Sequence, residues 1–215
     1  MDLTHALYTT RAMRRVLADP IPTEVVQSML DAAVRAPSGG NAQNWRFVAV
    51  TDPELRSAVG MLYQEAFDIL LERVYGKALE KARRENDQGT LRIISSAQWL
   101  ADHASQVPLW LFFYARGDLS GASIYPAVWS AMLAARGHEV GTCLTTILGE
   151  FKAEETDELL GVPSGRGWKQ AAAVSCGYPR GTWGLAQRSP VHRVAYADQW
   201  DSPVSWRVDE PLWNG

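Results

Sequence analysis

The stretch "PLWLFFYA" (108–115) constrains the fold of this chain most, because after its proline it carries only large apolar side chains and an alanine. A continuous apolar run of this length is typical of a β-strand that is buried on both faces. Such a strand needs other elements packed against each face of its sheet. We therefore expect a central sheet flanked by helices.

Helices and short strands alternate along the rest of the chain. Thr23 is the expected N-cap of a helix that Pro37 stops, because the residue before a proline avoids the α region. Gly137 is the expected C-cap of a later helix, and Gly76 and Gly89 are expected to interrupt a long helical segment. The expected order is helix, strand, helices, strand, helix, strand, helix, strand and tail, with the regular elements at 23–36, 46–51, 53–105, 108–115, 125–137, 143–147, 153–160 and 169–179.

This order favours a single α+β domain over residues 1–215, with a central mixed sheet, a core of 1–180 and a C-terminal extension of 181–215. The extension is irregular in pattern and rich in tryptophan, a residue that is common in cores and interfaces. An apolar tail is expected to lie against something, and a partner subunit is the expected place. The tryptophans of this tail are Trp183, Trp200, Trp206 and Trp213.

The composition argues against two classes of partner. A net charge of −3 provides no basic field for nucleic acid. No apolar stretch approaches the ~20 residues that span a bilayer, and the start "MDLTHALYTT" has no apolar signal core. Cys143 and Cys176 form no disulfide framework, which suits a reducing cytoplasm. We expect a cytoplasmic protein without a nucleic-acid or membrane partner.

Several catalytic patterns are missing from the sequence. The four histidines are scattered and have no metal-ligand spacing with the two cysteines, so we expect no metal site. The chain has no G-x-S-x-G elbow, no Walker loop and no G-x-G-x-x-G fingerprint. If the protein is an enzyme, an organic cofactor is expected to carry the reaction.

Two polar motifs remain. In "TTRAMRR" (9–15), Arg11 and Arg14 are three positions apart and would share one face of a helix, so that both could hold one phosphate. A solvated basic face is the alternative for this motif. The stretch "APSGGNAQNWRF" (36–47) places glycines and amide side chains between a helix and a strand. A plain loop is the alternative there, and Arg188 in "LAQRSPV" is ordinary when taken alone.

Taken together, the motifs resemble those of the nitroreductase family of FMN-dependent, NAD(P)H-using oxidoreductases. The resemblance runs from about residue 8 to 195 and is weakest between 60 and 105. The motifs that carry it, in the order of the family, are "RAMRR", "DPIP", "APSGGNAQNWRFVAV", "GTCLTT", "CGYPRG" and "QRSP".

The resemblance implies an FMN site. Arg11, Arg14 and the later Arg188 would clamp the flavin phosphate. Ser38, Asn41 and Gln43 would bind the ribityl chain and ring edge, while Gly39 and Gly40 would permit close backbone approach. The complete expected cofactor set is Thr10, Arg11, Ala12, Met13, Arg14, Pro37, Ser38, Gly39, Asn41, Gln43, Leu144, Thr145, Thr146 and Arg188. No side chain is expected to be catalytic, because the flavin N5 would carry the chemistry.

Two positions depart from the pattern of the family. Ala12 stands where a serine is usual, which removes or replaces one phosphate hydrogen bond. Asn44 stands where a proline usually follows the glutamine. FMN binding is still expected, but the substrate pocket is less well defined, and the segment 60–105 has no readable motif.

The resemblance implies a homodimer with active sites at the interface. NADH or NADPH would pass hydride to the flavin, and a small electron-poor acceptor such as a nitroaromatic, quinone or enone would then take its place. Alternatives are a specialised relative, either a reductive dehalogenase of halotyrosines or a flavin-cleaving enzyme, and a non-enzymatic flavin-binding protein. A further alternative is an interaction protein without a cofactor.

Overall fold

The computed structural model describes residues 1–213, which divide into two compact units. One unit comprises Arg11–Thr182, and the other comprises Met1–Thr10 together with the segment from Trp183 onward. The larger unit contains the sheet and its helices, and the smaller one contains the Trp-rich tail. None of the helices in the described part of the chain is both long enough and apolar enough to cross a membrane.

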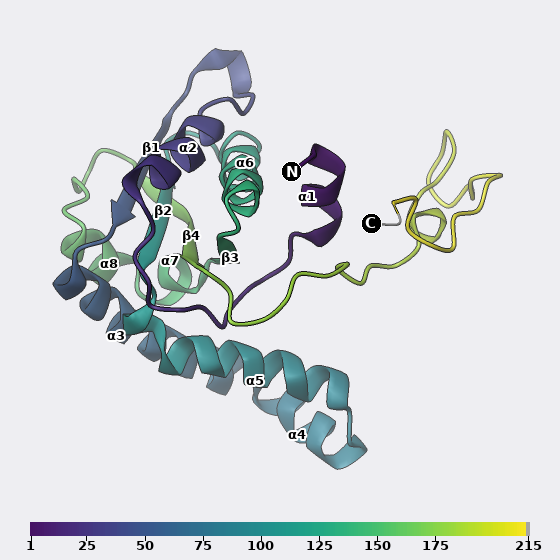
Figure 1. Cartoon of the computed structure of the whole chain (residues 1–215), viewed down its shortest axis with the longest axis horizontal. Helices are drawn as coiled ribbons and strands as arrows, with labels where there is room; N and C mark the ends of the chain where they lie inside the picture. The colour runs from purple at the N-terminus through teal and green to yellow at the C-terminus, as the bar shows by residue number, and fades with distance from the viewer. Residues whose placement is uncertain (214–215) are drawn as a thin grey trace. The chain divides into compact units, whose positions relative to one another are not determined.

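The larger unit is built on a four-stranded sheet with the strand order β1-β2-β4-β3 (Figure 1). The strands are β1 (Trp45–Val50), β2 (Leu109–Ala115), β3 (Gly141–Thr145) and β4 (Lys169–Gly177). Every residue of β2 is buried, so the strand expected to be covered on both faces is confirmed. The sheet was expected to be mixed, but the three strand pairs are antiparallel. Within the described residues, parallel pairing is found only at the isolated bridge between Ala12 and Thr142.

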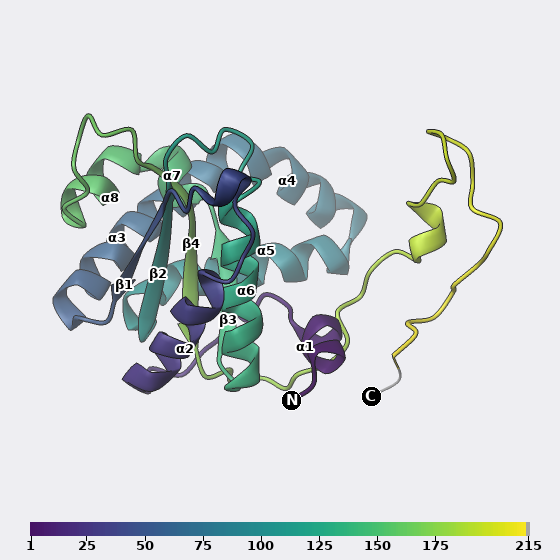
Figure 2. The ribbon, with the colours of Figure 1, turned by 90° about the horizontal axis from the view of Figure 1, so that it is seen from above.

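Helices cover both faces of the sheet, as Figure 2 shows. α2 (Thr23–Ala33) and α6 (Ile124–Gly137) pack on one face, where they share a core with Leu109, Leu111 and Phe113 of β2. α3 (Pro53–Leu70), α5 (Gln88–Asp102) and α7 (Ile147–Phe151) pack on the other face against Trp110, Phe112 and Tyr114. The alternation of side chains along β2 thus supplies both layers of the core.

The long helical segment is interrupted at different residues from those expected. α3 passes through a π-helical turn (Leu71–Tyr75) into α4 (Gly76–Glu85), so a break is found just before Gly76. The second break is at Asn86, which has a left-handed φ of 53°, rather than at Gly89. Gly89 lies inside the first turn of α5, where the Asp87 side chain caps the helix. Asparagine tolerates the left-handed region and replaces the expected glycine there.

Several helix ends differ from the expected ones by a few residues. Thr23 is the first helical residue of α2 rather than its N-cap, and this helix ends at Ala33, before Pro37. Gly137 is the last residue of α6, and the capping position is occupied by His138. β3 ends at Thr145, and Ile147 begins α7. The short helix α8 (Ala153–Leu159) is found close to its expected position.

The smaller unit joins the N-terminal helix to the tail. α1 (Leu3–Thr9) was not expected, and its Tyr8 carbonyl accepts a hydrogen bond of 3.1 Å from the Ala186 amide. The ring of Trp213 lies 5.0 Å from that of His5 and 5.7 Å from that of Tyr8. The tail otherwise has little regular structure, and its Trp200 is 83% exposed. A large exposed indole of this kind is typical of a surface that is covered in an assembly.

Candidate functional site

The arginine-rich segment is extended, so the expectation of a shared helical face for Arg11 and Arg14 is wrong. α1 ends at Thr9, and Thr10 already has extended dihedral angles. The Met13 amide then donates a hydrogen bond of 2.9 Å to the Thr142 carbonyl of β3. Further along, the Leu17 amide donates one of 2.8 Å to the Tyr178 carbonyl. Pairing with these distant backbone groups replaces the bonds that a helix would have made.

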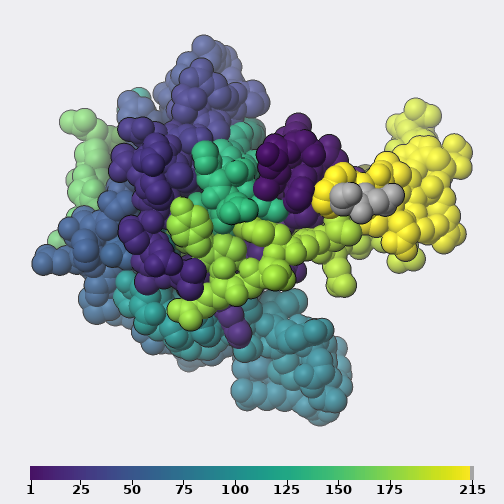
Figure 3. Space-filling model, in the orientation of Figure 1, coloured from purple at the N-terminus to yellow at the C-terminus, as the bar shows by residue number. Residues whose placement is uncertain are grey.

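Two glycines let this segment lie close to the sheet. A Cβ atom added at Gly141 would lie 2.7 Å from the Met13 Cβ, and one added at Gly177 would lie 2.7 Å from the Val16 Cβ. Real Cβ contacts are essentially never this short. The close approach of the segment therefore depends on the absence of a side chain at both positions. The arginine-rich segment also lies beside the residues that follow β4. Figure 3 shows both at the surface, the arginine-rich segment in purple and the residues after β4 in yellow-green.

A cavity of about 600 Å³ lies along this segment. Four of its lining residues are arginines, and none of the described residues that line it carries a carboxylate. Within the described chain, no ion pair joins these arginines to an acidic side chain. A hollow that is lined by positive charge, with no acidic side chain to neutralise it, attracts anions. The lining residues are Arg11, Ala12, Met13, Arg14, Arg15, Ser96, Trp99, Arg180 and Gly181.

The end of β3 lies beside the same segment. Arg14 is half-buried and interacts with the thiol of Cys143. Burial raises the pKa of that thiol, and the Arg14 guanidinium acts in the opposite direction. Burial also raises the pKa of Tyr63 on α3, while a hydrogen bond with Thr145 lowers it. The structure thus places Ala12 opposite Thr142 and Arg14 beside Cys143, and both Arg14 and the expected position Thr145 lie near Tyr63.

The loop after α2 has a tightly bonded conformation of its own. Ser38 Oγ accepts a hydrogen bond of 3.2 Å from the Gln43 amide, and Gln43 Nε2 donates one of 3.0 Å to Asn41 Oδ1. Asn41 and Gln43 have backbone φ angles of 54° and 49°, in the left-handed region that residues other than glycine seldom adopt. Such conformations cost free energy and are often found at binding sites. The loop borders a cavity of about 280 Å³, with Ser123 Oγ accepting from the Gly39 amide at 3.3 Å.

The two groups of expected cofactor residues lie at opposite ends of the sheet. The 38–43 loop leads into Trp45, which pairs with Ala115 at one end of β2, whereas Leu109 at the other end pairs with Cys176. The strand separates these ends by roughly 20 Å, at about 3.3 Å per residue. Figure 2 shows the loop at one end of the strands and the purple arginine segment at the other. A packed core fills the space between them, so one chain does not bring the two groups together.

Thr10 and Arg188 belong to the smaller unit. The Thr10 hydroxyl donates a hydrogen bond of 2.7 Å to the Ala6 carbonyl. Arg188 is exposed, and its guanidinium donates one of 2.8 Å to the adjacent Gln187 carbonyl. Their role toward a phosphate stays a prediction.

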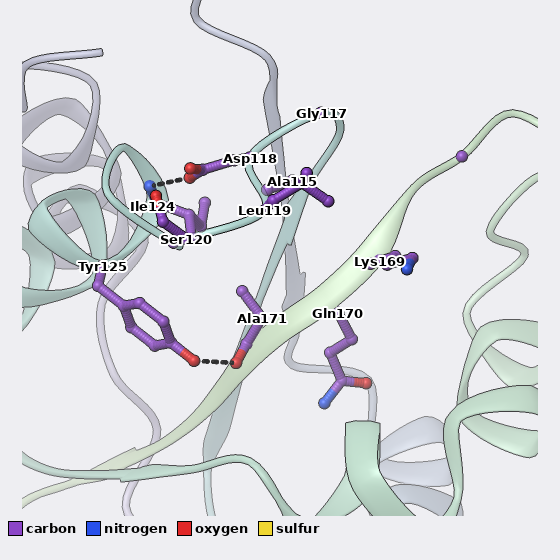
Figure 4. A pocket seen from close by; sticks show the side chains of 12 residues that line it. Ala115, Gly117, Asp118, Leu119, Ser120, Ile124, Tyr125, Lys169, Gln170 and Ala171 are labelled. Atoms are coloured by element: carbon purple, nitrogen blue, oxygen red, sulfur yellow. Dashed lines mark hydrogen bonds between the residues drawn. The ribbon is translucent and has the colours of Figure 1, made fainter. Parts of the chain in front are cut away.

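A second hollow next to the 38–43 loop was not expected from the sequence (Figure 4). It has a volume of about 420 Å³ and includes Lys169 in its lining. Asp118 accepts hydrogen bonds of 3.0 Å and 2.9 Å from the amides of Ser123 and Ile124, which fixes the entry into α6. The Tyr125 hydroxyl donates one of 3.1 Å to the Ala171 carbonyl. The contacts of Asp118 are local in the sequence, whereas Tyr125 and Ala171 are 46 positions apart and meet only in the folded chain.

Sequence reasoning also missed Trp99, Ser96 and Arg180 of the arginine-lined cavity. Trp99 lies in the helical segment without a motif, and no local signal relates it to the N-terminal arginines. Among the described residues there is no group of histidine, cysteine or acidic side chains that could hold a metal ion.

Comparison with known proteins identifies the fold. The model of the Nitroreductase family matches residues 7–178. The NADH dehydrogenase of Thermus thermophilus is 30% identical over 212 residues, covering 90% of this chain and 95% of that protein.

Two solved structures share the fold at low identity. A BluB-like flavoprotein from Clostridium difficile 630 has a TM-score of 0.69 and 18% identity, over 93% of this chain and all of that one (100%). An oxidised iodotyrosine deiodinase bound to FMN and 3-iodo-L-tyrosine has a TM-score of 0.67 and 22% identity, over 84% of this chain and 91% of that one. The α+β class and the arrangement of sheet and helices are thereby confirmed.

Proposed function

The chain belongs to the nitroreductase family, and from this premise we propose that it is a homodimeric, FMN-dependent oxidoreductase that uses NADH or NADPH to reduce a small electron-poor acceptor. When bound, the flavin would supply the two-electron chemistry by which a hydride from the nicotinamide reaches the acceptor. The balance is NAD(P)H, a proton and the acceptor on one side, and NAD(P)⁺ and the acceptor reduced by two electrons on the other.

The residues of the arginine-lined cavity fit the phosphate end of FMN. A phosphate monoester carries a charge of about −1.5 to −2 at neutral pH, and arginine binds it through paired, charge-assisted hydrogen bonds. Arg11 and Arg14 supply such donors without a competing carboxylate in the lining. The methyl of Ala12 adds no donor of its own. The backbone pairing with β3 fixes the segment before any ligand is bound.

Residues at the end of β3 would lie against the ring system. The side chain of Leu144 is 38% exposed, which leaves an apolar surface for a planar ring. Thr145 and Thr146 offer hydroxyl groups beside it, and these residues orient the flavin and exclude water rather than move protons. The positive charge of the nearby guanidiniums stabilises negative charge that develops on a bound reduced cofactor.

The observation that carries the proposal is the separation of Arg11–Arg14 from Ser38–Gln43 by the length of the sheet. Both groups belong to the expected flavin site, but a single chain presents them at opposite ends. Two copies related by a two-fold axis can each supply the group that the other lacks. We infer that each active site combines the arginine segment of one chain with the Ser38–Gln43 loop of a second copy.

Hybrid dimers test this arrangement. One chain would carry Arg11→Ala with Arg14→Ala, and the other Asn41→Gly with Gln43→Gly, since glycine keeps the positive φ of the loop without strain. Each homodimer should lose flavin and activity. In a hybrid isolated through two affinity tags, one site collects all the substitutions and the other is intact, so flavin content and rate should recover to about half. A hybrid as inactive as its parents would show that both groups serve the same chain's site.

The acceptor can be sought among two chemical classes. Nitroaromatics, quinones and enones are the main candidates, and halotyrosines are a second class because a solved deiodinase shares the fold. An anaerobic screen with both classes, started by NADH or NADPH, compares them directly. Oxidation of no more than about one NAD(P)H per bound flavin, whichever acceptor is present, would favour a non-enzymatic flavin-binding role.

A further inference from the structure

Two arginines of the cavity, Arg15 and Arg180, lie outside the expected set of cofactor residues. Arg15 and Arg180 are exposed, and each guanidinium carbon lies 5.9 Å from the ring centre of Trp99 on α5. Their backbones are tied together, because the Arg180 amide donates a hydrogen bond of 2.9 Å to the Arg15 carbonyl. Arg180 Nε also donates one of 3.1 Å to the Val16 carbonyl. The two cations are therefore held on one aromatic platform.

The platform itself is fixed by its own helix. The ring of Trp99 stacks on that of His103 at 4.0 Å and 9°. His103 Nδ1 lies 2.8 Å from the Trp99 carbonyl oxygen, which orients the imidazole. The ring of His103 stacks on this indole and the two guanidiniums lie over it, so the indole holds the two cations next to each other. Two adjacent guanidiniums held in this way suit a phosphate group of a ligand.

The charge of the cavity also favours a ligand that brings a second phosphate group. Its lining holds four guanidiniums and, among the described residues, no carboxylate. One phosphate monoester of about −2 neutralises roughly half of that charge. A second phosphate group would be attracted by the remainder. NADPH differs from NADH by just such a group, the 2′-phosphate on its adenosine ribose.

We propose that Arg15 and Arg180, with Trp99, bind the 2′-phosphate of NADPH and make it the preferred electron donor. This inference rests on the proposed function in that it takes a nicotinamide nucleotide as the donor. The subsite uses residues other than Arg11 and Arg14, so it can be tested separately from cofactor binding.

The first measurement is calorimetric binding of adenosine 2′,5′-bisphosphate and adenosine 5′-monophosphate to the protein as purified. The bisphosphate should bind at least about tenfold more tightly, because charge-assisted hydrogen bonds of an added phosphate are worth that much. Arg15→Gln and Arg180→Gln should remove most of the difference. Arg84→Gln on α4 is the control, because it removes one positive charge outside the cavity lining. This variant should keep the difference in affinity between the two nucleotides.

The second measurement is kcat/KM with each donor. The kcat/KM of the wild type should be about tenfold or more higher with NADPH than with NADH. In the two cavity variants, kcat/KM with NADPH should fall toward the value with NADH, while kcat/KM with NADH stays the same. FMN affinity should fall much less than NADPH efficiency in both, because Arg11 and Arg14 are retained. Equal binding of the two nucleotides by the wild type, or loss of NADH efficiency and FMN together, would overturn the subsite. A protein without flavin would refute the proposed function, while the calorimetric comparison would still decide the subsite.

Discussion

The backbone amide of Met13 donates a hydrogen bond of 2.9 Å to the carbonyl of Thr142. This single contact joins the N-terminal arginine segment to the outer strand of the sheet, β3. It also decides that the arginines project from an extended chain rather than from a helix. The consequences of this attachment can be measured.

Replacing Gly141 by alanine should push the arginine segment away from β3. The added Cβ would lie 2.7 Å from the Met13 Cβ, and overpacking of this kind costs about 1–3 kcal/mol. We expect a lower free energy of unfolding in urea and weaker FMN binding in the same variant. Gly137→Ala is the control, because nothing lies within 4 Å of its added Cβ. If Gly141→Ala bound FMN like the wild type, the attachment to β3 would not position the arginines.

Arg188→Ala should weaken FMN binding, if this residue completes the phosphate clamp. Loss of a hydrogen bond to a charged group costs roughly 1.5–3 kcal/mol, so the dissociation constant should rise about ten- to a hundredfold. Arg188→Lys should fall between the two, since lysine keeps the charge but loses the planar fork. Turnover at saturating FMN should largely recover. Titration of the apo-protein with FMN makes the measurement, and an unchanged constant would assign Arg188 to ordinary surface.

Truncation after Arg193 should yield insoluble or flavin-free protein. The removed tail includes Trp200, which is 83% exposed in the single chain, and Leu212, which is 79% exposed. Such side chains fit an apolar subunit interface, and interfaces of obligate dimers commonly bury more than about 2,000 Å². Sedimentation and flavin absorbance of the truncated chain make the measurement. A soluble monomer with its full flavin content would contradict the interface role.

Stability should fall as the pH rises above about 8.5, the ordinary pKa of a cysteine thiol. Burial raises the pKa of Cys143 and of Cys176, so the folded chain keeps protons that the unfolded chain releases. Unfolding then loses protons, and its free energy decreases with pH by about 1 kcal/mol per thiol between pH 7.5 and 9.5. Urea unfolding at these two values makes the measurement. Cys176→Ala should show about half of the decrease, and an undiminished decrease would point to other groups.

The sequence predicted those parts of the fold that have a local cause. The apolar run of β2 and the end of α2 before Pro37 are properties of single segments. The break at Asn86 was missed because asparagine and glycine both adopt a positive φ, and only the caps around α5 distinguish the two positions. The extended form of Arg11–Arg14 was missed for a different reason: the spacing fits a helix, and pairing with the distant Thr142 overrides it.

The site was predictable as two motifs but not as an arrangement. The residues from Ser38 to Gln43 stand out by composition alone, whereas their distance from Arg14 depends on the strand order. Trp99 and Arg180 meet Arg15 only because α5 and the end of β4 pack on the same segment. A spacing pattern cannot contain such contacts.

The placement of the two motifs at opposite ends of one sheet couples assembly to cofactor capture. If every flavin bridges two chains, binding of the flavin and association of the chains are linked, and each strengthens the other by the same factor. Dilution would then release the cofactor, and added FMN would draw separated chains together. Specific activity would depend on protein concentration, so that the amount of protein in a cell would control the activity of each copy as well as their number.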